Sequence, residues 1–181
     1  MKTALLVIDM QKDYFPGGRM ELEGTHAAAQ NVKTLLGRFR KIGDPIVFMQ
    51  HVSLSEQTGF FLQDTEGIDI HESVEPQHGE VVMQKHFPNS FRGTDLLEYL
   101  KRRDVKQLVI CGAMSHMCVD ATTRAAVDYG FRCTVVEDAC ATKRLVFNGD
   151  EIPAGHVHGT IMAALNGIYA EITDTDHFLS L

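Results

Sequence analysis

A chain of 181 residues is long enough for one domain with a sizeable core, and 44% hydrophobic and 23% charged residues are ordinary for a soluble globular protein. A formal net charge of −7 without a basic cluster argues against nucleic-acid binding and against an anionic membrane as partner. The first apolar run is too short for a membrane span and ends at Asp9 rather than at a small-residue cleavage site, so we expect a cytoplasmic protein.

Short apolar runs alternate with helical patterns along the chain. In chain order the pattern predicts a strand at 3–8, a helix at 26–42 that ends at Gly43, a strand at 45–50, a strand at 80–84, a helix at 94–103 with Thr94 as N-cap, a strand at 107–111, a helix at 117–129 that ends at Gly130, a strand at 131–136, a helix at 153–169 with Pro153 in its first turn, and a strand at 170–173.

The predicted strands are apolar throughout rather than alternating, which indicates burial on both faces, as in a parallel sheet covered by helices. The βαβ rhythm therefore predicts a three-layer α/β/α fold, and we expect a single domain over residues 1–181. Such sheets bind ligands beyond the C-terminal ends of their strands, next to a change in strand order.

Residues 52–79 form a polar, aperiodic stretch of unusual length for a loop in a compact domain. We expect it to act as a lid over a site or to reach a neighbouring subunit.

Four cysteines occur without a CxxC pair. Cys111 and Cys133 lie in strand interiors, where a free thiol packs as a small hydrophobe. Cys118 and Cys140 lie just outside such runs. Cys118 follows a strand and a tight loop at the start of a helix, where the dipole would lower the pKa of a thiol and favour the reactive thiolate. The alternative is a packed, inert thiol.

Asp9 and Lys85 follow two other strands and fall on the same predicted edge of the sheet as Cys118. Asp9 would accept the proton of the thiol and later pass it to a leaving group, and Lys85 would hold the charges of both. Asp9 could equally cap a loop, and Lys85 could be a surface lysine with a packed stem. Asp13 competes for the role of base but lies further into the loop, where we expect it to be solvated.

Three segments together resemble the isochorismatase-like cysteine hydrolases. They are the run from Asp9 to Asp13, Lys85 with the following Ser90, Phe91 and 94–96, and the run 112–119 around Cys118. The order and spacing are similar over nearly the whole chain. The resemblance implies a Cys118–Asp9–Lys85 catalytic triad and a six-stranded parallel sheet ordered 3-2-1-4-5-6, a Rossmann-like arrangement. It also implies a cis peptide at Ala113–Met114, which would turn the Met114 N–H toward an oxyanion beside the N–H of Cys118.

Nicotinamidases of this family carry a metal-binding Asp-x-His after the second strand, whereas this chain has only His51 there. One histidine is a poor metal site. His71 and His78 could be recruited, but we expect them to be solvated or satisfied, and His156 and His158 lie on different faces of the last helix. We therefore predict no metal and no cofactor, and we do not expect nicotinamide as substrate.

A cysteine beside an aspartate and a lysine argues for nucleophilic attack on the carbonyl of a small amide, ureide or carbamoyl compound. We expect the pocket to be lined by His116 and by loop aromatics, although several of these could belong to the core: Phe15, Phe60, Phe61, Phe87 and Phe91. His116 could equally be a loop residue bonded to the backbone. The resemblance implies a homodimer or higher homo-oligomer. Two alternatives remain open: an ether hydrolase like isochorismatase itself, and a non-enzymatic binding or thiol-sensing module.

Overall fold

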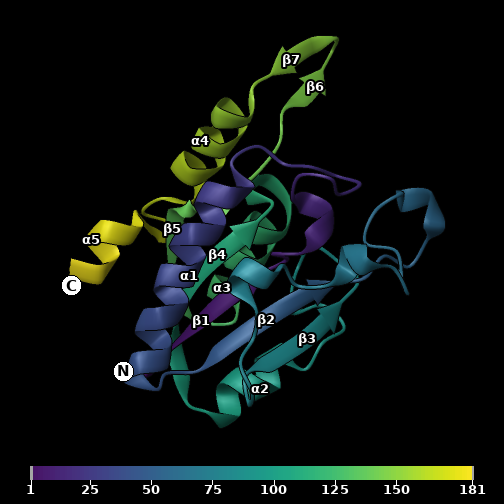
Figure 1. The fold of residues 1–181 in the computed structure, drawn as a ribbon. Coiled ribbons are helices and arrows are strands. Elements are labelled where there is room, and N and C mark those ends of the chain that lie inside the picture. The colour runs from purple at the N-terminus through teal and green to yellow at the C-terminus, as the bar shows by residue number, and fades with distance from the viewer. Residues whose placement is uncertain (1, 181) are drawn as a thin grey trace.

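The computed structural model describes residues 2–180 and contains a six-stranded, all-parallel sheet (Figure 1). The strands are β1 (Lys2–Ile8), β2 (Ile46–His51), β3 (Val81–Lys85), β4 (Val105–Ala113), β5 (Arg132–Ala141) and β8 (Glu171–Thr173). Their order in the sheet is β3-β2-β1-β4-β5-β8. Since β8 is the sixth strand of this sheet along the chain, the predicted order 3-2-1-4-5-6 is confirmed.

Helices cover both faces of the sheet, as predicted (Figure 1). One face carries α1 (Thr25–Ile42) and α5 (Thr175–Ser180), and the other carries α2 (Leu96–Arg102), α3 (Asp120–Asp128) and α4 (Ala154–Leu165). Alternate residues of β1 enter different core clusters, Leu5 and Val7 on the α1 face and Leu6 and Ile8 on the other. Double-sided burial therefore explains the uninterrupted apolar strands. The edge strand β3 departs from this pattern, with Val82 43% exposed.

Three predicted helix boundaries can be compared with the structure. Gly43 ends α1 in the left-handed conformation, as predicted. Thr94 was expected as N-cap, but α2 begins at Leu96 with Asp95 as its N-cap, and the Thr94 hydroxyl bonds to the Ser90 carbonyl instead. The last long helix was predicted to reach 169 but ends at Leu165.

A two-stranded hairpin between β5 and α4 was missed by the sequence analysis. It consists of β6 (Leu145–Phe147) and β7 (Asp150–Ile152) and projects from the end of α4 in Figure 1. Asn148 and Gly149 form its turn with φ angles of 52° and 87°. An Asn-Gly pair between short apolar runs is a strong signal for such a turn, so the sequence did contain the information.

The long segment 52–79 is docked along the residues that follow β1. Three short 3-10 helices interrupt it, at Glu56–Thr58, Glu66–Ile68 and Glu72–Val74. The Lys12 N–H donates to the Asp69 carbonyl, and the His71 N–H donates to the Met10 carbonyl. The part of the segment around residues 60–71 therefore forms a wall beside the C-terminal edge of the sheet.

Asp13 holds this wall in place and is buried rather than solvated, which corrects the expectation from the sequence. Its Oδ2 accepts a hydrogen bond of 2.6 Å from the Phe61 N–H, and its Oδ1 accepts one of 3.2 Å from the Arg19 N–H. The carboxylate accepts hydrogen bonds from the backbone of two loops, so it joins these loops.

Among the described helices, none is both long and apolar enough to cross a membrane.

Candidate active site

The structure brings Asp9, Lys85 and Cys118 together at the C-terminal edge of the sheet. Asp9 follows β1, Lys85 is the last residue of β3, and Cys118 lies in the π-helical turn Ser115–Val119 between β4 and α3. Lys85 Nζ lies 2.8 Å from Asp9 Oδ2, and both side chains are fully buried. The Cys118 sulfur lies within 4.8 Å of an Asp9 oxygen and of a ring nitrogen of His51.

The Asp9 carboxylate combines full burial with a left-handed backbone, φ 50°. Within the described chain no donor is aligned for a hydrogen bond to either of its oxygens, so its contact with Lys85 is an ion pair of off-line geometry. A buried carboxylate without aligned donors keeps its lone pairs available to a proton from the thiol or from a bound molecule.

The Lys85 ammonium has three polar neighbours: Asp9, its ion-pair partner at 2.8 Å, and two hydrogen-bond partners, Nδ1 of His51 and the Phe87 carbonyl, each at 3.1 Å. Burial on its own lowers the pKa of Lys85, but the charge of Asp9 and the contact with Cys118 outweigh it and raise that pKa. Lys85 is therefore a fixed cation.

His51 is a neutral partner of Lys85 whose role the sequence analysis did not recognise. Burial and the Lys85 charge lower the pKa of His51 to about 4, against a smaller opposing effect of Asp9. Because Lys85 donates to Nδ1, we assign the ring hydrogen to Nε2. The buried Gln11 side chain fixes the His51 backbone, accepting from its N–H at 2.7 Å and donating to its carbonyl at 2.8 Å.

The Cys118 thiol is 4% exposed, and its electrostatic environment is opposite to the one expected from the helix terminus. Burial, followed by the neighbouring Asp9 charge, raises the pKa of Cys118, and the opposing effect of Lys85 is smaller. Loss of solvation and the nearby carboxylate both disfavour the thiolate. The raised pKa favours the protonated thiol beside the Asp9 carboxylate.

The turn before Cys118 is built on a close approach of β4 to β1. Gly112 has a φ of 118°, and a Cβ at this position would lie 2.0 Å from the Ile8 carbonyl oxygen, so only glycine fits. The next peptide bond, Ala113–Met114, is cis. The Met114 carbonyl accepts from the N–H groups of Met117 and Val119, which closes the turn that carries Cys118.

Tyr14 is a site residue that the sequence analysis passed over. Its ring lies 4.5 Å from the ring of Phe61 and 6.0 Å from that of Phe60, and its side chain is buried. Burial, and then the charges of Cys118 and Asp9, raise the pKa of Tyr14. The sequence signal that could have pointed to Tyr14 is its position directly between Asp13 and Phe15, two residues that the sequence analysis did consider.

The predicted pocket aromatics separate into two groups. Phe60 and Phe61 surround Tyr14, and Phe61 lies 5.8 Å from the His51 ring. The others have packing partners: Phe15 stacks on His71 at 3.6 Å, Phe87 lies under Arg92 at 3.7 Å, and Phe91 packs on Tyr129 and Phe131. Phe15, Phe87 and Phe91 thus have packing partners within the chain, and their contact with a substrate stays a prediction. The other predicted contact residue, His116, bonds through Nδ1 to the Thr142 hydroxyl at 2.6 Å.

Among residues 2–180, one group of side chains has metal-ligand chemistry: Asp9, His51 and Cys118 offer ligand atoms within 4.8 Å of one another. The Lys85 ammonium, however, lies 2.8 Å from the first and 3.1 Å from the second. A cation bound there would meet a fixed positive charge, so these residues fit a metal ion poorly. His71 stacks on Phe15 and bonds to Ser73, away from this group.

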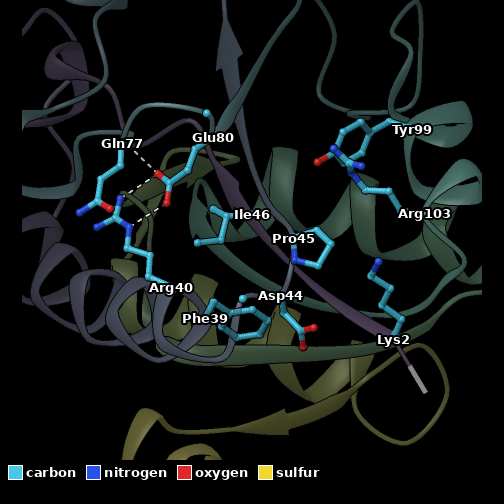
Figure 2. A pocket seen from close by; sticks show the side chains of 12 residues that line it. Lys2, Phe39, Arg40, Asp44, Pro45, Ile46, Gln77, Glu80, Tyr99 and Arg103 are labelled. Carbon is cyan, nitrogen blue, oxygen red and sulfur yellow. Dashed lines mark hydrogen bonds and ion pairs between the residues drawn. The ribbon is translucent and has the colours of Figure 1, made fainter.

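A cavity of about 390 Å³ lies at the opposite edge of the sheet (Figure 2). It is lined by residues at or just before the first residues of strands, including Lys2, Ile46 and Arg103, and by the ion pair of Arg40 with Glu80 at 2.7 Å. Neither Cys118 nor Asp9 nor Lys85 borders it. We therefore place the candidate active site at the buried cluster around Cys118 and not in this cavity.

The model of the isochorismatase domain matches residues 3–175. The chain belongs to the isochorismatase family. The resemblance seen in the sequence is thereby confirmed, and members of this family are hydrolases.

Several isochorismatase-family relatives match most of the chain. An uncharacterized family protein of Bacillus subtilis, YddQ, is 53% identical over 99% of each chain. The maleamate amidohydrolase of Pseudomonas putida is 30% identical over 76% of this chain and 71% of its own. A solved isochorismatase-hydrolase structure from Oleispira antarctica superposes with a TM-score of 0.96 at 47% identity, covering 99% of this chain and 97% of that one.

Proposed function

We propose that this isochorismatase-family protein hydrolyses a C–N bond of a small amide, ureide or carbamoyl compound through a thioester on Cys118. The observation that carries this proposal is the convergence of a thiol, a carboxylate and a fixed ammonium at one buried point, with Asp9 and Lys85 2.8 Å apart. These are a nucleophile, a base and a charge anchor.

The mechanism starts from the neutral thiol. Because the pKa of Cys118 is raised, its proton passes to Asp9 as the sulfur attacks the carbonyl carbon. The tetrahedral intermediate collapses when the C–N bond breaks and the nitrogen takes the proton from Asp9. Water then attacks the thioester with Asp9 again as base, which releases the acid and restores the thiol. Lys85 stays beside Asp9 throughout, at the 2.8 Å separation of their ion pair.

The oxyanion of the intermediate needs hydrogen-bond donors, and we assign this role to the backbone N–H groups of Met114 and Cys118. Both belong to the turn that follows the cis peptide Ala113–Met114. Each such donor is worth about 3–4 kcal/mol in enzymes where it has been removed.

Two observations favour C–N hydrolysis over the alternatives. A relative with 30% identity is named as an amidohydrolase. The buried, high-pKa thiol of Cys118 also lacks the exposed, low-pKa character of a redox sensor. An ether hydrolase that works by protonation would not need the thiol beside Asp9.

The test is a screen of small amides, ureides and carbamoyl compounds for release of ammonia or amine, with Cys118→Ala as the matched control. We expect turnover by the native chain, a loss of at least 10³-fold in the variant with an unchanged circular-dichroism spectrum, and an acyl adduct on Cys118 by mass spectrometry. Full activity of Cys118→Ala would refute the nucleophile assignment and favour the ether hydrolase.

Two further parts of the proposal concern the cellular compartment and the oligomeric state of the enzyme. All four cysteines are free thiols, which fits a reducing cytoplasm. We also propose a homo-oligomer, supported by the exposed apolar tip of the β6–β7 hairpin, where Val146 and Phe147 are each 69% exposed. The partner of the active site is a small molecule, and we expect no metal or cofactor.

A further inference from the structure

A chain of three hydrogen-bonded side chains lies behind the turn that carries Cys118. His158 Nδ1 lies 2.8 Å from the Ser115 hydroxyl, and His158 Nε2 lies 3.2 Å from Glu137 Oε2. Glu137 belongs to β5, His158 to α4, and Ser115 directly follows the cis peptide Ala113–Met114. The sequence analysis found no role for His158, and the mechanism above does not use it.

Ser115 is fully buried, so it is not a second nucleophile despite its histidine and glutamate neighbours. Its position suggests another role, because it lies between Met114 and Cys118, whose N–H groups are the oxyanion donors in the proposed function. The only other bond of its hydroxyl in the described structure is a long one of 3.4 Å to the Ala141 carbonyl. The contact with His158 is therefore the short anchor of this side chain.

We propose that His158, oriented by Glu137, is a positioning residue that holds Ser115 and thereby keeps the Met114 and Cys118 N–H groups aimed at the oxyanion. The inference rests on the proposed function and adds residues to its site. Glu137 accepts the hydrogen of Nε2, and Nδ1 contacts the Ser115 hydroxyl. The contacts of this relay thus run from β5 through α4 to the turn.

Small displacements of this turn matter because oxyanion donors act only when they lie at hydrogen-bond distance from the developing charge. A misplacement of about 1 Å far from the reacting atoms can cost about 10²-fold in rate. The relay would therefore affect the chemical step more than substrate binding.

The experiment uses two replacements that preserve different ends of the ring. In His158→Asn the side-chain amide occupies the place of Nδ1 and can still bond to Ser115, whereas in His158→Gln the amide reaches the place of Nε2 and can bond only to Glu137. His156→Gln is the matched control, since His156 is exposed on the same helix. All variants are first compared with the native chain by thermal unfolding.

We expect His158→Gln to lower kcat by about 10- to 100-fold with KM changed less than threefold. His158→Asn should recover activity to within about fivefold of the native chain, and His156→Gln should match the native chain. Ser115→Ala should show the same loss as His158→Gln, and the double variant should lose no more than either single one, because both interrupt the same relay. Equal losses in His158→Asn and His158→Gln, or no loss in either, would overturn the inference.

A second readout separates this inference from the proposed function. Propanal labelled with ¹³C at C1 adds to a thiol: the S–C bond forms, the carbonyl π bond opens, and the thiol proton ends on the new hydroxyl oxygen. Its carbon resonance reports this hemithioacetal on Cys118 whether or not any amide is hydrolysed. Weaker adduct formation in His158→Gln than in His158→Asn supports the relay even if the amide screen is negative, and identical adduct formation overturns it even if the screen is positive.

Discussion

His51 is a buried histidine whose ring remains neutral because burial and Lys85 both oppose its protonation. Its pKa of about 4 in the folded chain lies below the ordinary value of 6.5. Between these values the unfolded chain binds a proton that the folded chain does not, so stability falls as the pH drops from about 6.5 to 4. Above this window His51 contributes no pH dependence.

We expect the free energy of unfolding of the native chain to lose roughly 3 kcal/mol from this residue over that window. His51→Gln should reduce the slope by a corresponding amount, and replacement of the exposed His78 by Gln should not. Urea unfolding at a series of pH values measures the effect. Parallel pH profiles for native chain and His51→Gln would contradict the assignment of a neutral, buried ring.

Gly112 lies where β4 closely approaches the backbone of β1. A Cβ there would lie 2.0 Å from the Ile8 carbonyl oxygen, and the backbone is left-handed. We expect Gly112→Ala to destabilise the fold by at least about 3 kcal/mol, since backbone atoms cannot move aside. Gly37→Ala in the middle of α1, where nothing lies within 4 Å, should instead stabilise by up to about 1 kcal/mol. Thermal unfolding compares the two, and a tolerated Gly112→Ala would contradict the close approach.

At this scale the sequence predicted which reactive residues to examine but not their environment. Asp9, Lys85 and Cys118 were found because each lies at or beyond the C-terminal end of a strand of one parallel sheet. The predicted direction of the Cys118 pKa shift was wrong, because the shift depends on burial of the thiol, which residue spacing does not reveal. Asp13 was expected in solvent for the same reason, since its partners are backbone N–H groups of remote loops.

Among the elements, the docking of the 60–71 region onto the end of β1 depends on one tight contact. A Cβ on Gly67 would lie 2.3 Å from Asp13 Oδ2, and that carboxylate is held by two backbone N–H groups. We expect Gly67→Ala to cost about 1–3 kcal/mol. In an Asp13→Ala background the clash is absent, so the same change should cost much less.

A double-mutant cycle on Gly67→Ala and Asp13→Ala, followed by urea unfolding, measures this coupling. Additive effects would show that the two residues do not meet. Loss of amide-hydrogen protection confined to residues 60–71 in Asp13→Ala would show that the carboxylate fastens this wall of the site.

The main elements were predictable because apolar runs and helix caps are local signals. Strand order followed from the resemblance and is confirmed by the sheet. The β6–β7 hairpin was missed, although the Asn148–Gly149 pair is typical of a hairpin turn. The helix α4 was predicted too long because its apolar pattern continues into the turn after Leu165. The docking of 52–79 was not predictable, because it depends on buried polar contacts made between distant segments.

For the molecule as a whole, the proposed homo-oligomer depends on the exposed tip of the β6–β7 hairpin. We expect the native chain to form a dimer or larger oligomer and the double replacement Val146→Ser, Phe147→Ser to shift it toward monomer, because an exposed apolar pair favours burial against another surface. Light scattering after size-exclusion chromatography measures the mass. Leu54→Ser, at a position 72% exposed in the long loop, is the control.

A monomeric native chain would contradict the oligomer, and a mass that falls equally in the Leu54 control would place the interface elsewhere. Neither outcome affects the site around Cys118, whose three principal side chains come from a single chain.

The raised pKa of the almost fully enclosed Cys118 sulfur has a consequence for the enzyme between turnovers. A protonated sulfur reacts slowly with peroxides and with stray electrophiles, which attack the thiolate. Only a molecule that fits against Asp9 and presents a carbonyl carbon would induce the proton to leave. Between turnovers the sulfur would thus react slowly with other compounds, and the thiolate would form only when the substrate binds.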